Sequence, residues 1–178
     1  MTYDLTTHRH RFAVWAAARA AQRGFTNVDN LRLAVESCGI VKYVRERAAD
    51  SILEEDFRRL HRECCHGIMT SLNGAGVAGV SYGRAAKLVA IYLKTSVVLG
   101  GLHECDLARV AHPPIDGILL RNLSVAHKLD DRRRGWRDVR WTQLTEEQYE
   151  ALVGELRDVL PRDAPLWHLE EYWTVTDK

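Results

Sequence analysis

Apolar residues recur at intervals of three and four along much of the chain, and no strong alternation of apolar and polar residues occurs anywhere. The first pattern is typical of helices that bury one face, and the second would indicate strands. The spacing predicts helices over His8–Arg23, over Thr26–Cys38 and from Ser51 to about Leu72. Gly24 and Gly39 follow the first two helices as stop signals. Residues 40–50 fit no single pattern.

A glycine-rich stretch (Gly74, Gly76, Gly79, Gly83) leads into the most apolar segment of the chain. Ser81 is a suitable N-cap, so a helix is expected from Tyr82 to about Val98, before the glycines at 100 and 101. Apolar side chains cover most of this helix. We therefore expect it to be nearly surrounded by protein.

One narrow stripe of the same helix is basic and contains Arg84, Lys87 and Lys94. Lysines are mostly exposed in proteins, so the stripe can be a solvated face. Alternatively, it lines a groove, where partial desolvation would free a lysine amine to act as a nucleophile. The sequence leaves both interpretations open.

A polar loop follows, and it ends in His112-Pro113-Pro114-Ile115-Asp116. The two prolines favour extended backbone, and the apolar residues after Asp116 predict a new helix that fades near Ala126. Asp116 lies at the N-cap of this helix. It can be only a cap, or it can also be the acid partner of a lysine.

Two further helices are predicted near the C-terminus. Thr145 and Gln148 form a capping box that opens a helix to about Leu160, which Pro161 ends. Pro165 begins a last short helix, Leu166–Trp173, whose aromatic residues are expected to close the core. The fold expected for residues 1–178 is a single compact all-α domain of six to eight helices.

The run Ala78-Gly79-Val80-Ser81-Tyr82-Gly83-Arg84-Ala85-Ala86-Lys87-Leu88 resembles the hairpin and following helix of the helix-hairpin-helix DNA glycosylases, in particular the 8-oxoguanine-type enzymes. Pro114-Ile115-Asp116 and the apolar residues 118–120 are similar to the second half of that pattern. The resemblance covers residues 78–122 and extends the expected fold to a glycosylase-like arrangement.

This resemblance implies a DNA N-glycosylase or lyase that needs no cofactor. Lys87 would attack the sugar and expel the base, and Asp116 would activate the lysine and stabilise the positive charge on the sugar. Gly79, Gly83 and Arg84 would contact the nucleic acid. The segment between Lys87 and Asp116 is longer than in most members of the family, so residues 100–111 would be an insertion and Lys94 is an alternative nucleophile.

The whole chain is also similar to a group of short bacterial helical proteins of unassigned function. The shared motifs are the opening His10-Arg11-Phe12-Ala13-Val14-Trp15 and the ending Trp167-His168-Leu169-Glu170-Glu171-Tyr172-Trp173. This similarity implies no activity.

The net charge of +1 hides an uneven distribution of charge. Residues 143–178 carry nine acidic and three basic residues, which leaves the earlier part of the chain with an excess of positive charge that could meet phosphates. Arg134, Trp136 and Arg137 belong to an arginine- and tryptophan-rich stretch that could grip nucleic acid. Alternatively, the tryptophans are buried and nearby aspartates neutralise the arginines.

Metal binding is not predicted, because Cys64, Cys65 and His66 lack the spacing of a zinc site. The four cysteines are expected to be reduced thiols. No apolar run approaches the roughly 20 residues that cross a bilayer, and a signal peptide is not apparent, so a cytoplasmic protein without membrane contact is expected.

The sequence is compatible with three functional classes. The first is the glycosylase-like, DNA-acting enzyme. The second is a non-enzymatic helical interaction or regulatory module, for example in bacterial defence, that binds nucleic acid, a protein partner or a second copy of the chain. The third is a small-molecule pocket lined by His103, His112 and Asp116.

Overall fold

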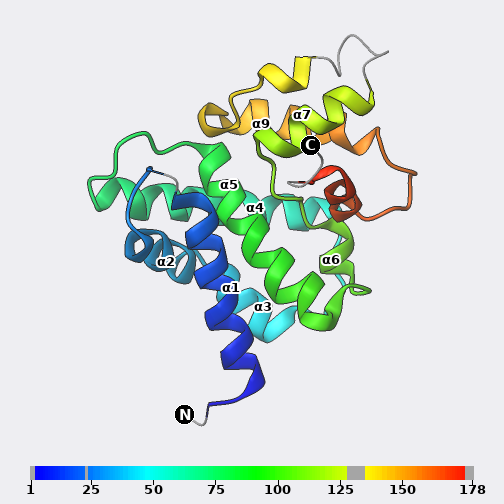
Figure 1. The fold of residues 1–178 in the computed structure, drawn as a ribbon. Coiled ribbons are helices and arrows are strands. Elements are labelled where there is room, and N and C mark those ends of the chain that lie inside the picture. Colours follow the sequence, from blue (N-terminus) through cyan, green and yellow to red (C-terminus); the bar gives the residue numbers. More distant parts are fainter. Residues whose placement is uncertain (1–2, 23, 128–134, 175–178) are drawn as a thin grey trace.

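A central helix, α5 (Tyr82–Leu93), organises the packing of the other helices (Figure 1). Every residue of α5 except Arg84 is buried, as the apolar pattern predicts. The computed structural model describes residues 3–22, 24–127 and 135–174, and these contain helices but no strand. The predicted compact, all-α fold is therefore confirmed.

Four helices from the first half of the chain surround one side of α5. Helices α1 and α4 make the most extensive contacts with it, α2 fills the space between them, and α3 packs on α2 and α4. The four are α1 (Leu5–Gln22), α2 (Val28–Ser37), α3 (Ile40–Arg47) and α4 (Glu54–Gly74).

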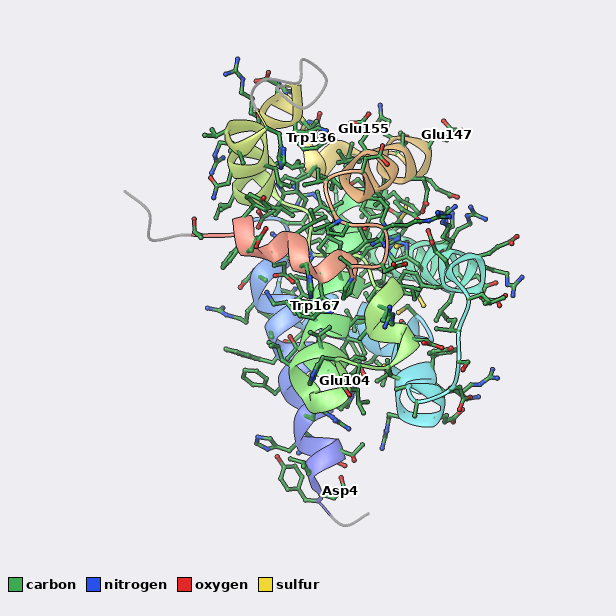
Figure 2. The ribbon with its side chains drawn as sticks, turned by 90° about the vertical axis from the view of Figure 1, so that its right-hand side faces the viewer. Asp4, Glu104, Trp136, Glu147, Glu155 and Trp167 are labelled. Atoms are coloured by element: carbon green, nitrogen blue, oxygen red, sulfur yellow. The ribbon has the colours of Figure 1, made fainter. Side chains whose placement is uncertain are left out.

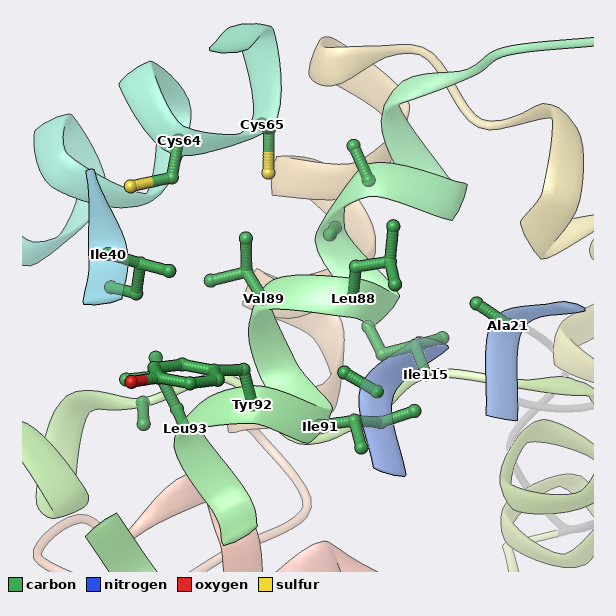
Figure 3. Close-up of a cluster of buried hydrophobic side chains, with 14 of the residues drawn as sticks. Ala21, Ile40, Cys64, Cys65, Leu88, Val89, Ile91, Tyr92, Leu93 and Ile115 are labelled. Atoms are coloured by element: carbon green, nitrogen blue, oxygen red, sulfur yellow. The ribbon is translucent and has the colours of Figure 1, made fainter. Parts of the chain in front are cut away.

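Figure 3 shows this core around α5. Leu88, Val89 and Tyr92 extend from α5, and Cys64 and Cys65 approach from α4. The two thiols are buried and make no disulfide, and burial helps to raise the pKa of each well above its usual value. They pack as apolar side chains, as expected for reduced cysteines.

Helix starts follow the predicted capping residues closely. The Ser81 hydroxyl accepts the amide of Arg84, and Thr145 and Gln148 form the predicted capping box at the start of α9 (Glu146–Arg157). Helix α2 begins at Val28, later than the predicted start at Thr26. Its N-cap is Asn27, whose side-chain oxygen accepts the amide of Asn30.

The predicted helix from Tyr82 to Val98 is not α-helical throughout. It continues after Leu93 as a π-helix, η1 (Lys94–Leu102), in which Gly101 adopts a φ of 89°. Ser96 donates its hydroxyl to the carbonyl of Tyr92 at 2.6 Å, and such side-chain bonds to the preceding turn disturb the regular helical pattern. A short helix, α6 (Asp106–Val110), then lies within the segment that was expected to be a polar loop.

Within the described residues, the stretch Tyr82–Leu102 is one helix that is long and apolar enough to span a membrane by length and composition alone. The expectation that no apolar run approaches this length is therefore wrong. Most of the stretch is buried inside the protein, which is the usual position of a core helix.

The C-terminal part packs across the upper end of α5 in Figure 1. It contains α7, α9 and short 3-10 helices, of which η3 contacts α5 directly and η4 contacts α6 and α7. These elements are α7 (Gly117–Ala126), η2 (Gly135–Asp138), η3 (Trp141–Gln143), α9 (Glu146–Arg157) and η4 (Leu166–Tyr172).

Candidate functional site

Lys87 and Asp116 meet in the interior of the protein. Lys87 lies on the second turn of α5, and Asp116 is the N-cap of α7, two residues after the second of the buried prolines 113 and 114. The ammonium nitrogen Nζ of Lys87 donates to the carboxylate oxygen Oδ2 of Asp116 at 3.0 Å. The two side chains are only 4% and 6% exposed, so water screens this ion pair very little.

Asp116 is both a helix cap and an ion-pair partner. Its oxygen Oδ1 accepts the amides of Ile118 and Leu119 at 2.9 and 3.1 Å, as the predicted N-cap requires. Its oxygen Oδ2 accepts the Lys87 ammonium and also the indole N–H of Trp173, which lies at 3.1 Å. Asp116 is therefore not only a cap, because it also contacts Lys87.

The pKa of Asp116 lies below its ordinary value. Burial raises it, but the charge of Lys87 and the hydrogen bonds from Leu119, Lys87 and Trp173 outweigh burial. Asp116 is therefore ionised at neutral pH, and the resting pair consists of an ammonium and a carboxylate.

An aromatic ring covers the Lys87 ammonium. The Trp141 ring centroid is 4.4 Å from Nζ, a distance at which the ring face attracts a cation. Trp141 can lie this close because its η3 backbone approaches α5 at Gly83, where an added Cβ would be 2.0 Å from the Trp141 carbonyl oxygen. A glycine is therefore needed at position 83 for packing.

A second lysine–acid pair lies on the same face of the helix. The ammonium of Lys94 at the start of η1 pairs with Glu170 of η4, and these side chains are 32% and 15% exposed. Burial raises the pKa of Glu170, although the hydrogen bond and charge of Lys94 oppose this effect. Lys94 also lies 5.7 Å from the Trp173 ring centroid, so Trp173 contacts both pairs.

The two pairs line one pocket of about 300 Å³. Helix α1 contributes Ala16 and Ala20 to its wall, and the α5–η1 helix contributes Ile91 and Thr95. The remaining lining residues are Lys87, Lys94, Pro114, Asp116, Glu170 and Trp173. The pocket thus combines apolar walls with two cations and two carboxylates, which suits it to bind a small polar group.

The predicted hairpin residues do not line this pocket. Gly79 is exposed with a φ of 71°, and the Gly83 amide donates to the carbonyl of Leu144 at 3.2 Å, so it is not free for a phosphate. The guanidinium of Arg84 stacks on Phe25, with its central carbon 4.0 Å from the ring centroid. Burial lowers the pKa of Arg84, and its Nε atom is buried without a hydrogen-bond partner.

The predicted arginine- and tryptophan-rich stretch is split by the fold. Trp136 is 2% exposed, and its indole N–H donates to Glu155 at 2.7 Å, so its ring is not available to stack on a base (Figure 2). The alternative that this tryptophan packs into the core is confirmed. Arg137 is exposed near Asp138, and Arg134 lies outside the described residues.

The proposed pocket of His103, His112 and Asp116 is wrong. His103 is exposed after η1, whereas His112 is buried in an aromatic cluster with Phe57, His61 and Tyr149. The prolines that follow His112 carry Asp116 away from this cluster towards Lys87. Only Asp116 of the three lines the candidate pocket.

His61, which no motif in the sequence marks, is fully buried. Its ring lies 4.7 Å from that of His112 between centroids, and burial lowers its pKa to about 3. Its spacing of four from Phe57, on the apolar face of α4, was the available signal. Within the part of the chain that the structure describes, no three His, Cys, Asp or Glu side chains are grouped to hold a metal.

Trp141, Glu170 and Trp173 were also not identified as members of the site. No local pattern marks them, because each contacts Lys87, Lys94 or Asp116 from an element distant in sequence from Lys87. Glu170 and Trp173 do belong to the tryptophan-rich ending noted in the sequence.

Comparison of the chain with protein-family models, with curated proteins and with solved structures gives no significant match. The interpretation of the site therefore depends on its geometry and chemistry.

Proposed function

We propose that the protein is a DNA glycosylase-like enzyme in which Lys87 is the nucleophile and Asp116 its acid partner. The observation that carries this proposal is the 3.0 Å contact between Lys87 Nζ and Asp116 Oδ2 beside a pocket of about 300 Å³. An amine and a carboxylate within hydrogen-bond reach of each other are the groups this chemistry requires.

The first chemical step needs the free amine of Lys87. Its ammonium proton passes to Asp116, and the Nζ lone pair attacks C1′ of the nucleotide sugar. The bond from C1′ to the base breaks, and its electron pair leaves with the base, which takes the proton from Asp116. The carboxylate that results then stabilises the positive charge on the sugar.

An imine forms in the next step. The Lys87 nitrogen, which still carries two protons, gives one of them through water to the ring oxygen as the bond between C1′ and the ring oxygen breaks. The ring oxygen becomes a hydroxyl, and the nitrogen keeps its other proton in a protonated imine. The product joins Nζ to C1′ by a double bond, which borohydride reduces to a stable amine. This covalent product distinguishes a lysine nucleophile from an activated water.

The pocket dimensions and walls suit a single base. Its volume is at the small end of the range for ligand pockets, which is about 300–1,000 Å³. Ala16, Ile91 and Pro114 offer apolar contacts to a ring, and Trp173 offers an aromatic one. An enzyme of this type acts on a single strand or draws the target nucleotide out of a duplex before reaction.

Borohydride trapping on oligonucleotides that carry damaged bases or an abasic site tests the proposal. We expect a covalent adduct with the natural protein, its loss in Lys87→Gln, and its retention in Lys94→Gln, which is the matched control in the same pocket. Because Lys87→Gln can impair folding, peptide mapping of the adduct on the natural protein provides a second measurement. An adduct at another residue, or none across a broad panel of lesions, would overturn the proposal.

A non-enzymatic binding module is the second candidate. It is favoured by the complete engagement of Asp116, which accepts four hydrogen bonds, as a purely structural buried pair would. Oligonucleotide binding without any trapped adduct would support this candidate.

A further inference from the structure

We infer that the outer face of α1 is a stacking platform for single-stranded nucleic acid that leads into the Lys87 pocket. The platform consists of Phe12 and Trp15, with Arg11 and Arg19 beside them. The inference rests on the proposed function, from which it takes nucleic acid as the class of partner.

The two aromatic rings are exposed and adjacent. Phe12 is 54% exposed and Trp15 is 52% exposed, and their ring centroids are 5.7 Å apart with planes inclined by 31°. Rings that are only tilted, and not perpendicular, offer faces of similar direction to successive bases. Aromatic side chains with exposed faces bind single strands because every base has a face to stack.

The platform is continuous with the candidate site. Phe12 also lines a neighbouring hollow of about 440 Å³ together with Leu5, Leu99 and Thr95. Thr95 lines the Lys87 pocket as well, and Ala16, one turn after Phe12 on α1, belongs to its wall. A strand stacked on Phe12 and Trp15 would therefore lie beside the pocket.

The charge of this face complements a polyanion. Helix α1 contains Arg9, Arg11 and Arg19 and no acidic residue. Asp4 precedes α1, and its carboxylate accepts the amide of Thr7. In Figure 1 the first turns of α1 extend beyond the other helices.

Two of these arginines are accessible to phosphates. Arg11 is exposed and lies over the Tyr3 ring, 5.3 Å from its centroid. Arg19 is exposed and donates to Gln22 at 2.9 Å. Arg9, in contrast, donates to the carbonyl of Gly100 at 2.6 Å and ties α1 to η1.

Fluorescence anisotropy with a labelled, undamaged oligothymidine tests the platform. We expect Trp15→Ala and Phe12→Ala each to weaken binding by about 5- to 150-fold. Leu53→Ala is the matched control, because Leu53 is an exposed apolar residue at the start of α4 and not on α1. The affinity of this variant for the oligothymidine should be unchanged. Arg11→Ala should reduce the slope of log affinity against log salt by about 0.7.

The outcomes separate the platform from the chemistry. The affinity of the natural protein and of the aromatic variants for the undamaged strand reports the platform, and the trapped adduct reports the chemistry. If both Trp15→Ala and Phe12→Ala bind the oligothymidine as tightly as the natural protein, the platform is overturned, even if the adduct forms. If both variants bind more weakly but the natural protein forms no adduct, only the proposed enzymatic activity is overturned. Tighter binding of duplex than of single strand, or a dimer that Trp15→Ala dissociates, would also overturn the inference.

Discussion

The indole N–H of Trp173 donates to the same Asp116 oxygen that accepts the Lys87 ammonium. A residue near the end of the described chain thus completes the hydrogen bonding of a buried carboxylate that also begins α7. The short helix η4 and the residue after it are consequently fixed over the Lys87 pocket.

We predict that Trp173→Phe, which keeps a ring but removes the donor, lowers the free energy of unfolding by about 1.5–3 kcal/mol. This is the usual contribution of a hydrogen bond to a charged group. Trp167 in the same segment is the control, since its indole nitrogen is buried without a hydrogen-bond partner (Figure 2). Urea unfolding should show a smaller loss for Trp167→Phe, and equal losses would contradict this account.

The Lys87–Asp116 pair should show strong coupling. We expect Lys87→Met and Asp116→Asn each to cost about 3–5 kcal/mol, because each leaves one buried charge without its partner. Asparagine still caps a helix, so the loss in Asp116→Asn reports mainly the charge. The double variant should lose much less than the sum, as measured by urea unfolding, whereas additive losses would show that the two groups act independently.

Stability should fall with acid below pH 6.5. Burial holds the pKa of His61 at about 3 and that of His112 well below its ordinary value of 6.5. The unfolded chain therefore takes up protons that the folded protein excludes, so the stabilisation is complete above pH 6.5 and is lost as the pH falls towards 3. With two such groups the slope approaches about 2.7 kcal/mol per pH unit.

Urea unfolding between pH 8 and pH 4 measures this slope. His61→Gln and His112→Gln should each flatten it, whereas His103→Gln at the exposed position should leave it unchanged. The same slope in all three variants would show that the buried histidines are not its source.

Gly83 should tolerate no side chain. In Gly83→Ala the new Cβ would meet the Trp141 carbonyl oxygen at 2.0 Å, and backbone cannot move aside as a flexible side chain can. We expect a loss of more than about 3 kcal/mol. Gly154→Ala on α9 is the matched control, because nothing lies within 4 Å of its Cβ and alanine should stabilise that helix by about 0.5–1 kcal/mol. Thermal unfolding of both variants checks this contrast, and a neutral Gly83→Ala would contradict the close approach of η3 to α5.

The regular structure was predictable where it depends on neighbouring residues. Ser81, Asp116 and Thr145 each cap a helix as expected, because an N-cap side chain bonds to amides only two or three positions away. The π-helix after Leu93 was not predicted, since the pattern of apolar residues continues unchanged through it. The sequence allowed the tryptophan at position 136 to lie either on the surface or in the core. It lies in the core because it packs against α9, where its indole N–H donates to Glu155.

The sequence by itself determined that α5 would be buried and would carry lysines on one face, and that Asp116 would begin a helix. These properties follow from the order of residues within a few turns. Only the tertiary structure decided that Lys87 and Asp116, 29 positions apart, form one buried pair and that Trp173, 57 positions beyond Asp116, completes it. The physical reason is that a buried charge is stable only where docked helices bring its partners together, and that placement depends on the packing of the whole chain.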